Sequence, residues 1–347
     1  MKIALIHYRL ILRGGLERRL INYTNDLIQK GHEVHIIVAK NSSEVTFPKS
    51  VKIHVLSLGL MPKVFRQRYF DYLLGKFMQQ HHFDLSISLM RTSHQDIVLC
   101  PGNHLGFLKA MGKNGGRLTD KEQIRSDRLA FQQSRAVVAA SQMMADEVTG
   151  LYGIDKEKVK LLPPPVNLEE FKFERKNEAS GLRNKYGLPQ DKRIFLFISS
   201  SHKRKGLPLL LELFEQAQDT DAVLVIAGLP PVQSSLKNVI DLQYIKQMEE
   251  LYAAATFTIH PARYEPFGQI VPESLSSGTP VIISDMCGAK EVVGMNDGLV
   301  IPLSDKKAWL NAIRNAKAED FEINQNYAAQ HQLTISAHVD SIINALN

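Results

Sequence analysis

The chain has 347 residues, of which 44% are hydrophobic and 22% are charged, as in ordinary soluble globular proteins. This length is too great for one hydrophobic core and suits two domains of about 150 to 190 residues. No run of about 18 apolar residues occurs, so we expect no membrane-spanning helix, and the N-terminal MKIALIHYRL predicts a β-strand rather than a signal peptide. Cys100 and Cys287 lie far apart and lack zinc-binding spacing, which favours a reduced, cytoplasmic protein with no metal site.

The net charge of +6 conceals an uneven distribution. Residues 1–165 contain 24 Lys and Arg against 14 Asp and Glu, whereas residues 166–347 contain 18 against 22, so the halves carry +10 and −4. A basic half suggests an anionic partner, either nucleic acid or an anionic membrane, or simply lysines spread over a solvated surface. Because no aromatic-basic recognition motif accompanies the charge, we expect no nucleic-acid binding.

The first half alternates predicted strands and helices. After a strand at residues 3–7, a turn at Gly14-Gly15 leads into a helix over about 17–30, which Gly31 ends, and a strand follows at 33–39. This order predicts a parallel, doubly wound sheet. The same patterning predicts further strands at 51–56, 85–89, 97–100, 136–140 and 159–162, and helices at about 66–80, 119–134 and 141–151.

The proline-rich segment LPPPV at residues 162–166 predicts a stiff linker and a domain boundary near residue 165. The second half repeats the alternation, with a mainly helical remainder after residue 284. Its predicted elements are strands at 194–199, 223–227, 257–260 and 280–284, and helices at 206–218, 245–254 and 269–277. We therefore predict an α/β protein with two Rossmann-like domains, residues 1–165 and 166–333, whose sheets face a central ligand-binding cleft. We expect that a final helix over about residues 334–347 can pack back on the first domain.

The most informative motif is HPARYEPFGQIVPESLSSGTPVI at residues 260–282. Glu265 lies in a loop just before a predicted helix, where its carboxylate can reach a sugar. Glu273 lies one turn into that helix, within reach of the hydroxyls of a ribose. Backbone N–H groups at the helix N-terminus can bind a phosphate or a sugar hydroxyl. The candidate ligand-binding residues after Glu265 are Phe267, Gly268, Gln269, Ile270 and Glu273. The alternative is that both glutamates are merely solvated.

A second motif, SSSHKRKG at residues 199–206, lies between a predicted strand and a helix. This position is the carboxyl end of the sheet, where ligands bind. Arg204 and Lys205 can neutralise a diphosphate leaving group, since a guanidinium fork and an ammonium point charge suit different oxygens. Elsewhere in a chain, such a basic tetrapeptide would usually be a solvated loop.

Weaker signals lie in the first half. RGGLER at 13–18 has Gly14 and Gly15 at a helix N-terminus, where backbone can approach a ligand, although a plain tight turn explains it equally well. Loop residues Asp96 and His104 follow strands and could contact the transferred sugar or act on the acceptor, but a lone loop histidine is more often structural. Asp219-Thr220-Asp221 precedes a strand, at the amino end of the sheet, and is interpreted as a turn rather than a metal site.

These motifs resemble those of the GT-B fold, retaining glycosyltransferases of family 4, over nearly the whole chain. The Glu265…Glu273 string looks like the paired-glutamate motif of that family, and GTPVIISDMCGAKEVV at 278–293 looks like the strand and glycine turn that follow it. Within the family, RGGLER, SSSHKRKG and HPARYEPFGQIVPES look most like bacterial lipopolysaccharide core glucosyltransferases.

The resemblance implies a nucleotide-sugar substrate, usually UDP-linked, such as UDP-glucose or a related UDP-hexose, with no separate cofactor. By the same resemblance Glu265 contacts the donor sugar, Glu273 the ribose, and Arg204 and Lys205 the diphosphate. Gly15 would face the phosphates, and His104 would lie near the transferred sugar. Two departures concern the base: residues 229–239 are too short and too proline-rich for the usual helix, and Gln243 stands where a glycine is common.

We therefore expect a retaining, metal-independent hexosyltransferase that acts on a lipopolysaccharide core or another cell-envelope glycan or glycolipid. A sugar-nucleotide epimerase of similar fold and a non-catalytic nucleotide-sugar-binding protein are the alternatives. Two stretches of the basic half, residues 60–80 and 105–117, mix cations with aromatic and aliphatic residues. They predict docking of a cytoplasmic protein on the inner face of the cytoplasmic membrane, unless the apolar residues are those of ordinary amphipathic core helices.

Overall fold

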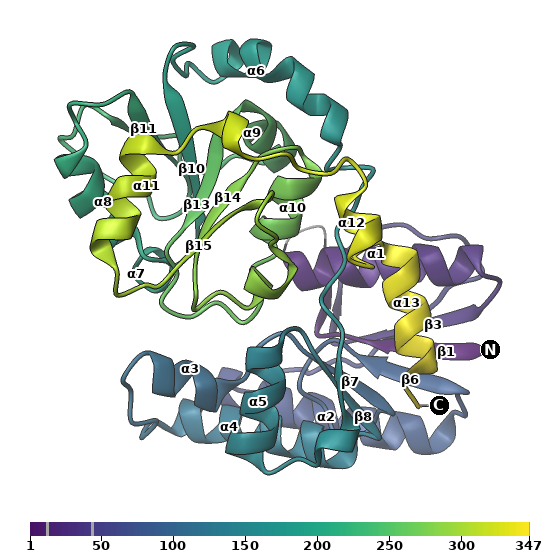
Figure 1. The fold of residues 1–347 in the computed structure, drawn as a ribbon. Coiled ribbons are helices and arrows are strands. Elements are labelled where there is room, and N and C mark those ends of the chain that lie inside the picture. The colour runs from purple at the N-terminus through teal and green to yellow at the C-terminus, as the bar shows by residue number, and fades with distance from the viewer. Residues whose placement is uncertain (12–13, 43–44, 347) are drawn as a thin grey trace. The chain divides into compact units, whose positions relative to one another are not determined.

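The computed structural model describes residues 1–11, 14–42 and 45–346. The chain divides into two compact units, and each has its own parallel sheet between helices (Figure 1). The N-terminal unit comprises Met1–Pro163 and returns at Ile335, whereas the C-terminal unit comprises Pro164–Thr334. In the described part of the chain, no helix is both long and apolar enough to cross a membrane.

The sheet of the N-terminal unit has the strand order β5-β3-β1-β6-β7-β8-β9, with all neighbours parallel. Its strands are β1 (Lys2–Ile6), β3 (Glu33–Val38), β5 (Lys52–Val55), β6 (Leu85–Ser88), β7 (Ile97–Cys100), β8 (Ala136–Ala139) and β9 (Val159–Leu161). A separate short pair joins β2 (Arg9–Leu10) to β4 (Lys40–Asn41). The helices are α1 (Gly15–Gln29), α2 (Arg66–Gln80), α3 (His104–Ala110), α4 (Leu118–Gln133), α5 (Gln142–Tyr152) and α13 (Ile335–Ile343).

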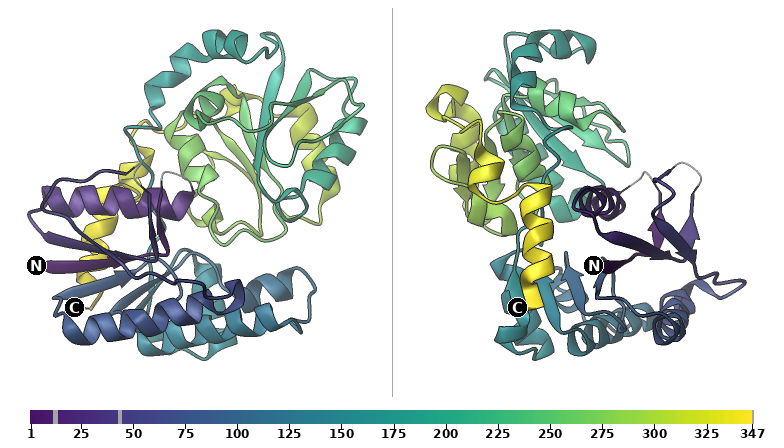
Figure 2. Two further views of the ribbon diagram at one scale, coloured as in Figure 1. Left: turned by 180° about the vertical axis from the view of Figure 1, so that it is seen from behind. Right: turned by 90° about the vertical axis from the view of Figure 1, so that its right-hand side faces the viewer.

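Helices cover both faces of this sheet because its strands are apolar on both sides. One core joins the sheet to α1 and α13, and two others join it to α2 and to α4 with α5. Helix α13 lies beside α1, as both views in Figure 2 show. The ring of His338 stacks on that of Tyr23 at 5.7 Å between centroids, and the Lys30 ammonium donates to Asp340 at 2.5 Å. The last helix is thus part of the N-terminal core.

The sheet of the C-terminal unit has the order β12-β11-β10-β13-β14-β15, again fully parallel. Its strands are β10 (Arg193–Ser199), β11 (Ala222–Gly228), β12 (Val239–Asp241), β13 (Phe257–His260), β14 (Val281–Ser284) and β15 (Gly298–Ile301). Its helices are α6 (Ala179–Lys185), α7 (His202–Lys205), α8 (Leu207–Gln216), α9 (Met248–Ala254), α10 (Ile270–Ser276), α11 (Lys306–Asn315) and α12 (Tyr327–Gln330). Helices α8 and α11 pack their apolar faces, including the fully buried Trp309, on one side of the sheet.

The predicted doubly wound architecture is confirmed in both units, although edge strands were missed and one local prediction was wrong. The region after residue 284 is mainly helical, as predicted, but it also contains β15, an edge strand beside β14 whose two middle residues are not buried and which the sequence pattern did not reveal. The predicted helix over 206–218 corresponds to α8, and the short helix α7 precedes it. The segment around His104 is not a loop: Asn103 caps α3 by accepting the N–H of Gly106 at 2.7 Å.

Candidate active site

Two loops meet at the carboxyl edge of the C-terminal sheet. Strand β10 ends at Ser199 and leads into α7, while its neighbour β13 ends at His260 and leads through a loop to α10. Strands β11 and β12 extend the sheet on one side of β10, and β13 to β15 extend it on the other. Ligands of open α/β sheets bind at such a reversal of strand order. The fold therefore brings together the motifs at residues 199–206 and 260–282, which lie about sixty residues apart in the sequence.

A cluster of charges at this edge is centred on the Oε2 atom of Glu265. This atom lies 3.1 Å from a terminal nitrogen of Arg204, 3.3 Å from Nε2 of His260 and 3.9 Å from the Lys205 ammonium. Burial favours the protonated form of Glu265, but His260 and the two cations outweigh it and lower the pKa of Glu265 to about 2. The carboxylate is therefore ionised at neutral pH and holds both cations in place.

The two predicted cations differ in how much of their hydrogen-bonding capacity is used. Burial lowers the pKa of Lys205 although Glu265 opposes this, and its ammonium also donates to the Ile198 carbonyl at 3.4 Å. Arg204 uses one terminal nitrogen for Glu265 and for the Tyr264 carbonyl, the latter at 2.7 Å. Over residues 1–11, 14–42 and 45–346, its Nε and other terminal nitrogen have no acceptor. Arg204 therefore keeps a pair of donors for an anionic ligand.

Two glycines allow the backbone of the site to pack closely against neighbouring segments. Gly206 has a φ of 92°, and a Cβ atom there would lie 2.0 Å from the carbonyl oxygen of Pro261. Gly268 has a φ of 101°, and its Cβ would lie 2.6 Å from the sulfur of Cys287 and 3.2 Å from Cγ of Glu265. The backbone conformation and the absence of a side chain are both needed at these positions.

We expect Gly268→Ala to lower the free energy of unfolding by about 1–3 kcal/mol, because it combines a disfavoured φ with overpacking. The added methyl should also displace Glu265 and weaken ligand binding. Thermal unfolding monitored by circular dichroism measures the first effect. Gly181→Ala is the matched control: it lies in α6 with nothing within 4 Å of its Cβ, and it should leave stability unchanged or slightly raised. Equal stability of Gly268→Ala and the unmodified chain would contradict this account.

The second glutamate of the motif lies within α10. The carboxylate of Glu273 accepts a hydrogen bond from the hydroxyl of Tyr252 at 2.7 Å, and Tyr252 is fully buried in α9. The bond orients the Glu273 side chain, which is only partly buried and can still reach a ligand. Tyr252 was not among the predicted site residues, since nothing in sequence places it 21 positions before its partner.

The side chains between Glu265 and Glu273 are mostly engaged within the C-terminal unit. Phe267 and Ile270 have buried side chains, 4% and 7% exposed, that pack into the unit. The side-chain amide of Gln269 donates to the Pro165 carbonyl at 2.7 Å, so it ties α10 to the start of the C-terminal unit. The Phe267 carbonyl accepts from the N–H of Ala289 at 2.7 Å, and the thiol of Cys287 donates to it at 3.0 Å.

The remaining candidates lie in the N-terminal unit. Gly14, with a φ of 100°, precedes α1, and Gly15 begins it with open space around its Cβ position. Arg13 of the same motif lies outside the described residues. His104 begins α3 with its Nε2 atom 2.9 Å from the Asp120 carboxylate. Asp96 accepts from the Ser86 hydroxyl at 2.7 Å and from its N–H at 2.9 Å, so its carboxylate joins β6 to the segment before β7.

The Asp219-Thr220-Asp221 segment lies at the amino end of β11. Asp221 accepts from Arg193 at 2.5 and 2.8 Å, and Asp219 accepts from Arg314 at 3.0 and 3.1 Å. Both carboxylates are therefore engaged at the edge of the sheet opposite the charged cluster.

Sequence reasoning also overlooked His260, which is fully buried at the end of β13 and bonds to Glu265. The only available signal was its place as the last residue of an apolar strand and the first residue of the motif. Gln243, noted as replacing a glycine, has a φ of 56°, in the left-handed region that glycine prefers. Its carbonyl accepts from the N–H of Gly228 at 2.7 Å, which closes the segment from 228 to 243.

Two doubly wound units in this order, with a cation pair and two glutamates at the carboxyl edge of the second, define a GT-B glycosyltransferase. Solved structures of this class share the fold. WaaG, a glycosyltransferase involved in lipopolysaccharide biosynthesis, superimposes with a TM-score of 0.74 at 19% identity, covering 99% of this chain and 95% of WaaG. Anabaena HepE in complex with UDP-glucose gives 0.75 at 16% identity, covering 100% and 99%.

The chain belongs to the group 1 glycosyltransferases, and its N-terminal half belongs to glycosyltransferase family 4. The family 4 model matches residues 13–170, and the group 1 model matches residues 180–332. A probable transglycosylase of Burkholderia thailandensis is 31% identical, covering 99% of this chain and 96% of the relative. The lipopolysaccharide glucosyltransferase WaaG of Escherichia coli is 21% identical, covering 90% of this chain and 88% of WaaG.

Proposed function

We propose that this glycosyltransferase moves a hexose from a UDP-sugar, such as UDP-glucose, to a lipopolysaccharide core or another cell-envelope glycan, with retention at the anomeric carbon and without a metal ion. The observation that carries the proposal is the cluster of Arg204, Lys205 and Glu265 at the switch point of the C-terminal sheet. The complex of HepE with UDP-glucose and the lipopolysaccharide role of WaaG support the choice of donor and acceptor.

In this mechanism the donor diphosphate lies against Arg204 and Lys205, which stabilise the negative charge that grows as the glycosidic bond breaks. The free donors of Arg204 suit one pair of phosphate oxygens, and the Lys205 ammonium suits another. Glu265 orients both cations and contacts the sugar, while Glu273 binds the ribose. The acceptor hydroxyl attacks from the face that the diphosphate leaves, and the departing phosphate takes its proton.

Two features favour a metal-free reaction. The protein supplies two cations where a divalent ion would otherwise neutralise the diphosphate. The aspartates that resemble a metal motif, Asp219 and Asp221, are paired with arginines at the opposite edge of the sheet. We assign acceptor binding to the N-terminal unit, with Gly14, Gly15 and His104 as candidate ligand-binding residues.

A thermal-shift panel of nucleotide sugars tests the donor assignment. A ligand at a hundred times its dissociation constant adds about 2.7 kcal/mol to the free energy of unfolding, which corresponds to a rise in Tm of roughly 5–10 °C. UDP-hexoses should give such a shift, and the variant Lys205→Ala should lose most of it. A shift with GDP- or ADP-sugars alone would contradict the UDP assignment.

Product analysis distinguishes the proposal from its alternatives. An epimerase would release an altered sugar and free nucleotide with no acceptor present, and a binding protein would release neither. Retention is read from the anomeric proton of the product by NMR, and an inverted product would exclude the same-face mechanism.

We also propose that the N-terminal unit docks on an anionic membrane. The structure corrects part of the sequence interpretation: Phe70 and Leu74 are fully buried against the sheet, as in any amphipathic core helix. Nearby apolar residues remain at the surface, with Leu60 fully exposed, Phe65 43% exposed and Tyr72 52% exposed. Surface cations among them add roughly 1 kcal/mol each near anionic lipid. The exposed members of this membrane-facing surface include Leu60, Lys63, Val64, Phe65, Arg68, Tyr72 and Lys76.

We expect the protein to co-sediment with vesicles that contain anionic lipid, and to do so less as salt increases. Leu60→Ser combined with Phe65→Ser should weaken binding, because apolar residues that enter the interface add to the attraction. Met295→Ser, which changes a 93% exposed residue of the C-terminal unit, is the control. Recovery of all protein in the supernatant at every lipid composition and salt concentration would leave a soluble acceptor as the better assignment.

A further inference from the structure

The N-terminal unit contains a cavity of about 340 Å³ at the carboxyl edge of its sheet. Its lining includes Tyr8, which follows β1, Arg91, which follows β6, and Gly102, which follows β7. Strand β1 lies between β3 and β6, so the strand order reverses here as it does in the C-terminal sheet. Both the position and the volume are those of a small-ligand site.

The charged residues that line this cavity are mostly positive. They are Lys63 from the turn before α2, Arg66 from the start of α2, Arg91 after β6, and one carboxylate, Asp127 of α4. Three cations and one anion leave an excess of two positive charges. A phosphate group near neutral pH carries between one and a half and two negative charges, so its charge matches this excess.

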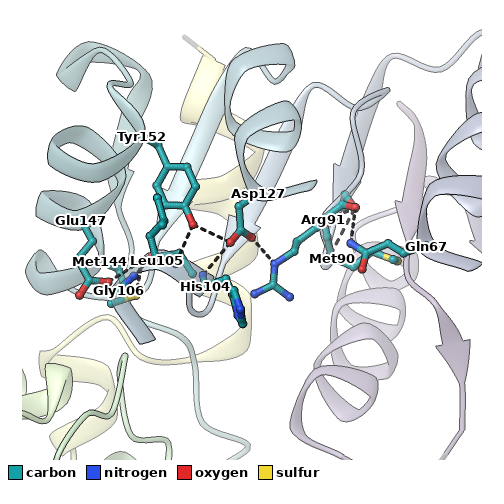
Figure 3. Close-up of polar contacts among 12 residues, drawn as sticks. Gln67, Met90, Arg91, His104, Leu105, Gly106, Asp127, Met144, Glu147 and Tyr152 are labelled. Carbon is teal, nitrogen blue, oxygen red and sulfur yellow. Dashed lines mark hydrogen bonds and ion pairs between the residues drawn. The ribbon is translucent and has the colours of Figure 1, made fainter. Parts of the chain in front are cut away.

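Arg91 is held in place by the buried Asp127 (Figure 3). The Asp127 carboxylate accepts from Nε of Arg91, from the Tyr152 hydroxyl at 2.8 Å and from the N–H of His104 at 2.7 Å. Burial lowers the pKa of Arg91, but the charge and hydrogen bond of Asp127, with smaller contributions from neighbouring groups, outweigh this effect, so the pKa is raised. About a third of the Arg91 side chain, 34%, remains exposed. Across the described ranges its terminal nitrogens have no acceptor, so a rigidly placed guanidinium presents free donors to the cavity.

The other two cations leave donors free in a similar way. Nε of Arg66 donates to the Met61 carbonyl at 2.8 Å, which positions the side chain, and its terminal nitrogens have no acceptor in the described chain. Lys63 is exposed and, within the same residues, makes no hydrogen bond or ion pair through its ammonium. Two guanidinium forks and one ammonium around one cavity suit the several oxygens of a phosphate.

We propose that this cavity binds a phosphate group carried by the acceptor, held by Arg91, Arg66 and Lys63 and separate from the donor diphosphate site. The proposal rests on the proposed function, since it takes the N-terminal unit to be the acceptor side of a glycosyltransferase. The phosphate anchors the acceptor and takes no part in bond making. A phosphorylated glycan and a lipid phosphate present the same chemistry.

Calorimetric titration with inorganic pyrophosphate at fixed ionic strength tests the site without any sugar or nucleotide. The unmodified chain should bind two equivalents, one at each cation cluster. Lys63→Gln combined with Arg66→Gln should weaken one class of site by at least about tenfold, since each lost bond to a charged group is worth about that factor. These substitutions spare Arg91, because its loss would leave the buried Asp127 carboxylate without a cationic partner. Lys160→Gln, exposed on β9 of the same sheet, is the control and should bind as the unmodified chain does.

A second variant separates this proposal from the proposed function. Arg204→Ala combined with Lys205→Ala should remove only the other class of site. If it removes all pyrophosphate binding, or if the Lys63 and Arg66 variant keeps two full sites, the acceptor-phosphate proposal is overturned. If the Arg204 and Lys205 variant keeps both sites while the cavity variant loses one, the cavity assignment stands and the donor site was misplaced.

The source of the phosphate is determined with vesicles of phosphatidylcholine with and without phosphatidic acid. A loss of phosphatidic-acid-dependent binding in Arg66→Gln, alongside the loss of pyrophosphate binding, supports a lipid-borne phosphate. A loss of pyrophosphate binding alone supports a soluble phosphorylated acceptor. If Arg66→Gln leaves both pyrophosphate binding and phosphatidic-acid-dependent vesicle binding unchanged, the proposal is overturned.

Discussion

Lys205→Ala and Arg204→Ala should each lower kcat by about 100-fold, whereas EDTA should leave the rate unchanged. Each substitution removes a cation that stabilises the leaving diphosphate, and loss of one such stabiliser in comparable sites costs roughly 3 kcal/mol in the transition state. The effect should fall mainly on kcat, because charge builds up on the diphosphate as the bond breaks. Initial rates at saturating donor, with and without chelator, measure it.

Lys203→Ala is the matched control for the cation pair. Lys203 lies in α7 beside both residues but is exposed, and no described residue pairs with it. It should keep full activity. Glu265 retains His260 and one cation in each single variant, so the fold should persist and the Tm should change little. Activity abolished by EDTA and restored by magnesium would overturn the metal-free mechanism.

Glu273→Ala should raise the dissociation constant of the donor by about 10- to 150-fold. This range corresponds to roughly 1.5–3 kcal/mol, the contribution of hydrogen bonds to a charged group. The chemical step at saturating donor should change less, because the ribose is bound equally in the ground state and the transition state. Calorimetry of the donor nucleotide and steady-state rates together measure both effects.

Tyr252→Phe provides a graded test of the same role. The ring remains packed while the hydroxyl that orients Glu273 is lost, so donor affinity should fall by less than in Glu273→Ala, by about 1 kcal/mol. If Glu273→Ala leaves donor affinity unchanged, the carboxylate does not bind the ribose, and its bond to Tyr252 is structural only.

Local patterns predicted the elements that bury a long apolar face. Helix α2 begins and ends where its spacing of apolar residues predicts, because residues such as Phe70 and Leu74 recur on one side of one continuous helix. Two edge strands were missed: β12 and β15 lack the unbroken run of buried residues that inner strands such as β7 and β13 have. The helix that begins at His104 was also missed, although Asn103 is a typical capping residue.

The motifs predicted which loops form the candidate site, but not the contacts that set its electrostatics. Glu265 and Arg204 belong to separate motifs, and only the parallel pairing of β10 with β13 brings them into contact. The interaction of Arg91 with Asp127 spans 36 residues and joins a loop to a helix, so no local spacing reveals it. Such contacts depend on which strands are neighbours, and hydrophobic periodicity does not specify strand order.

The return of the chain to the N-terminal unit has a consequence for the order of folding during synthesis. The C-terminal unit is one continuous segment, and the first and last parts of that segment pair through Val166, whose N–H donates to the Leu333 carbonyl at 2.8 Å. Val339 and Ile342 of α13 belong to the core that contains β1 and α1. The unit that emerges first from the ribosome therefore cannot complete its core until residue 342 has been made. Until then the apolar side of α1 that α13 covers stays exposed. The C-terminal unit, in contrast, has all of its residues once Thr334 has been made, before α13 is synthesised.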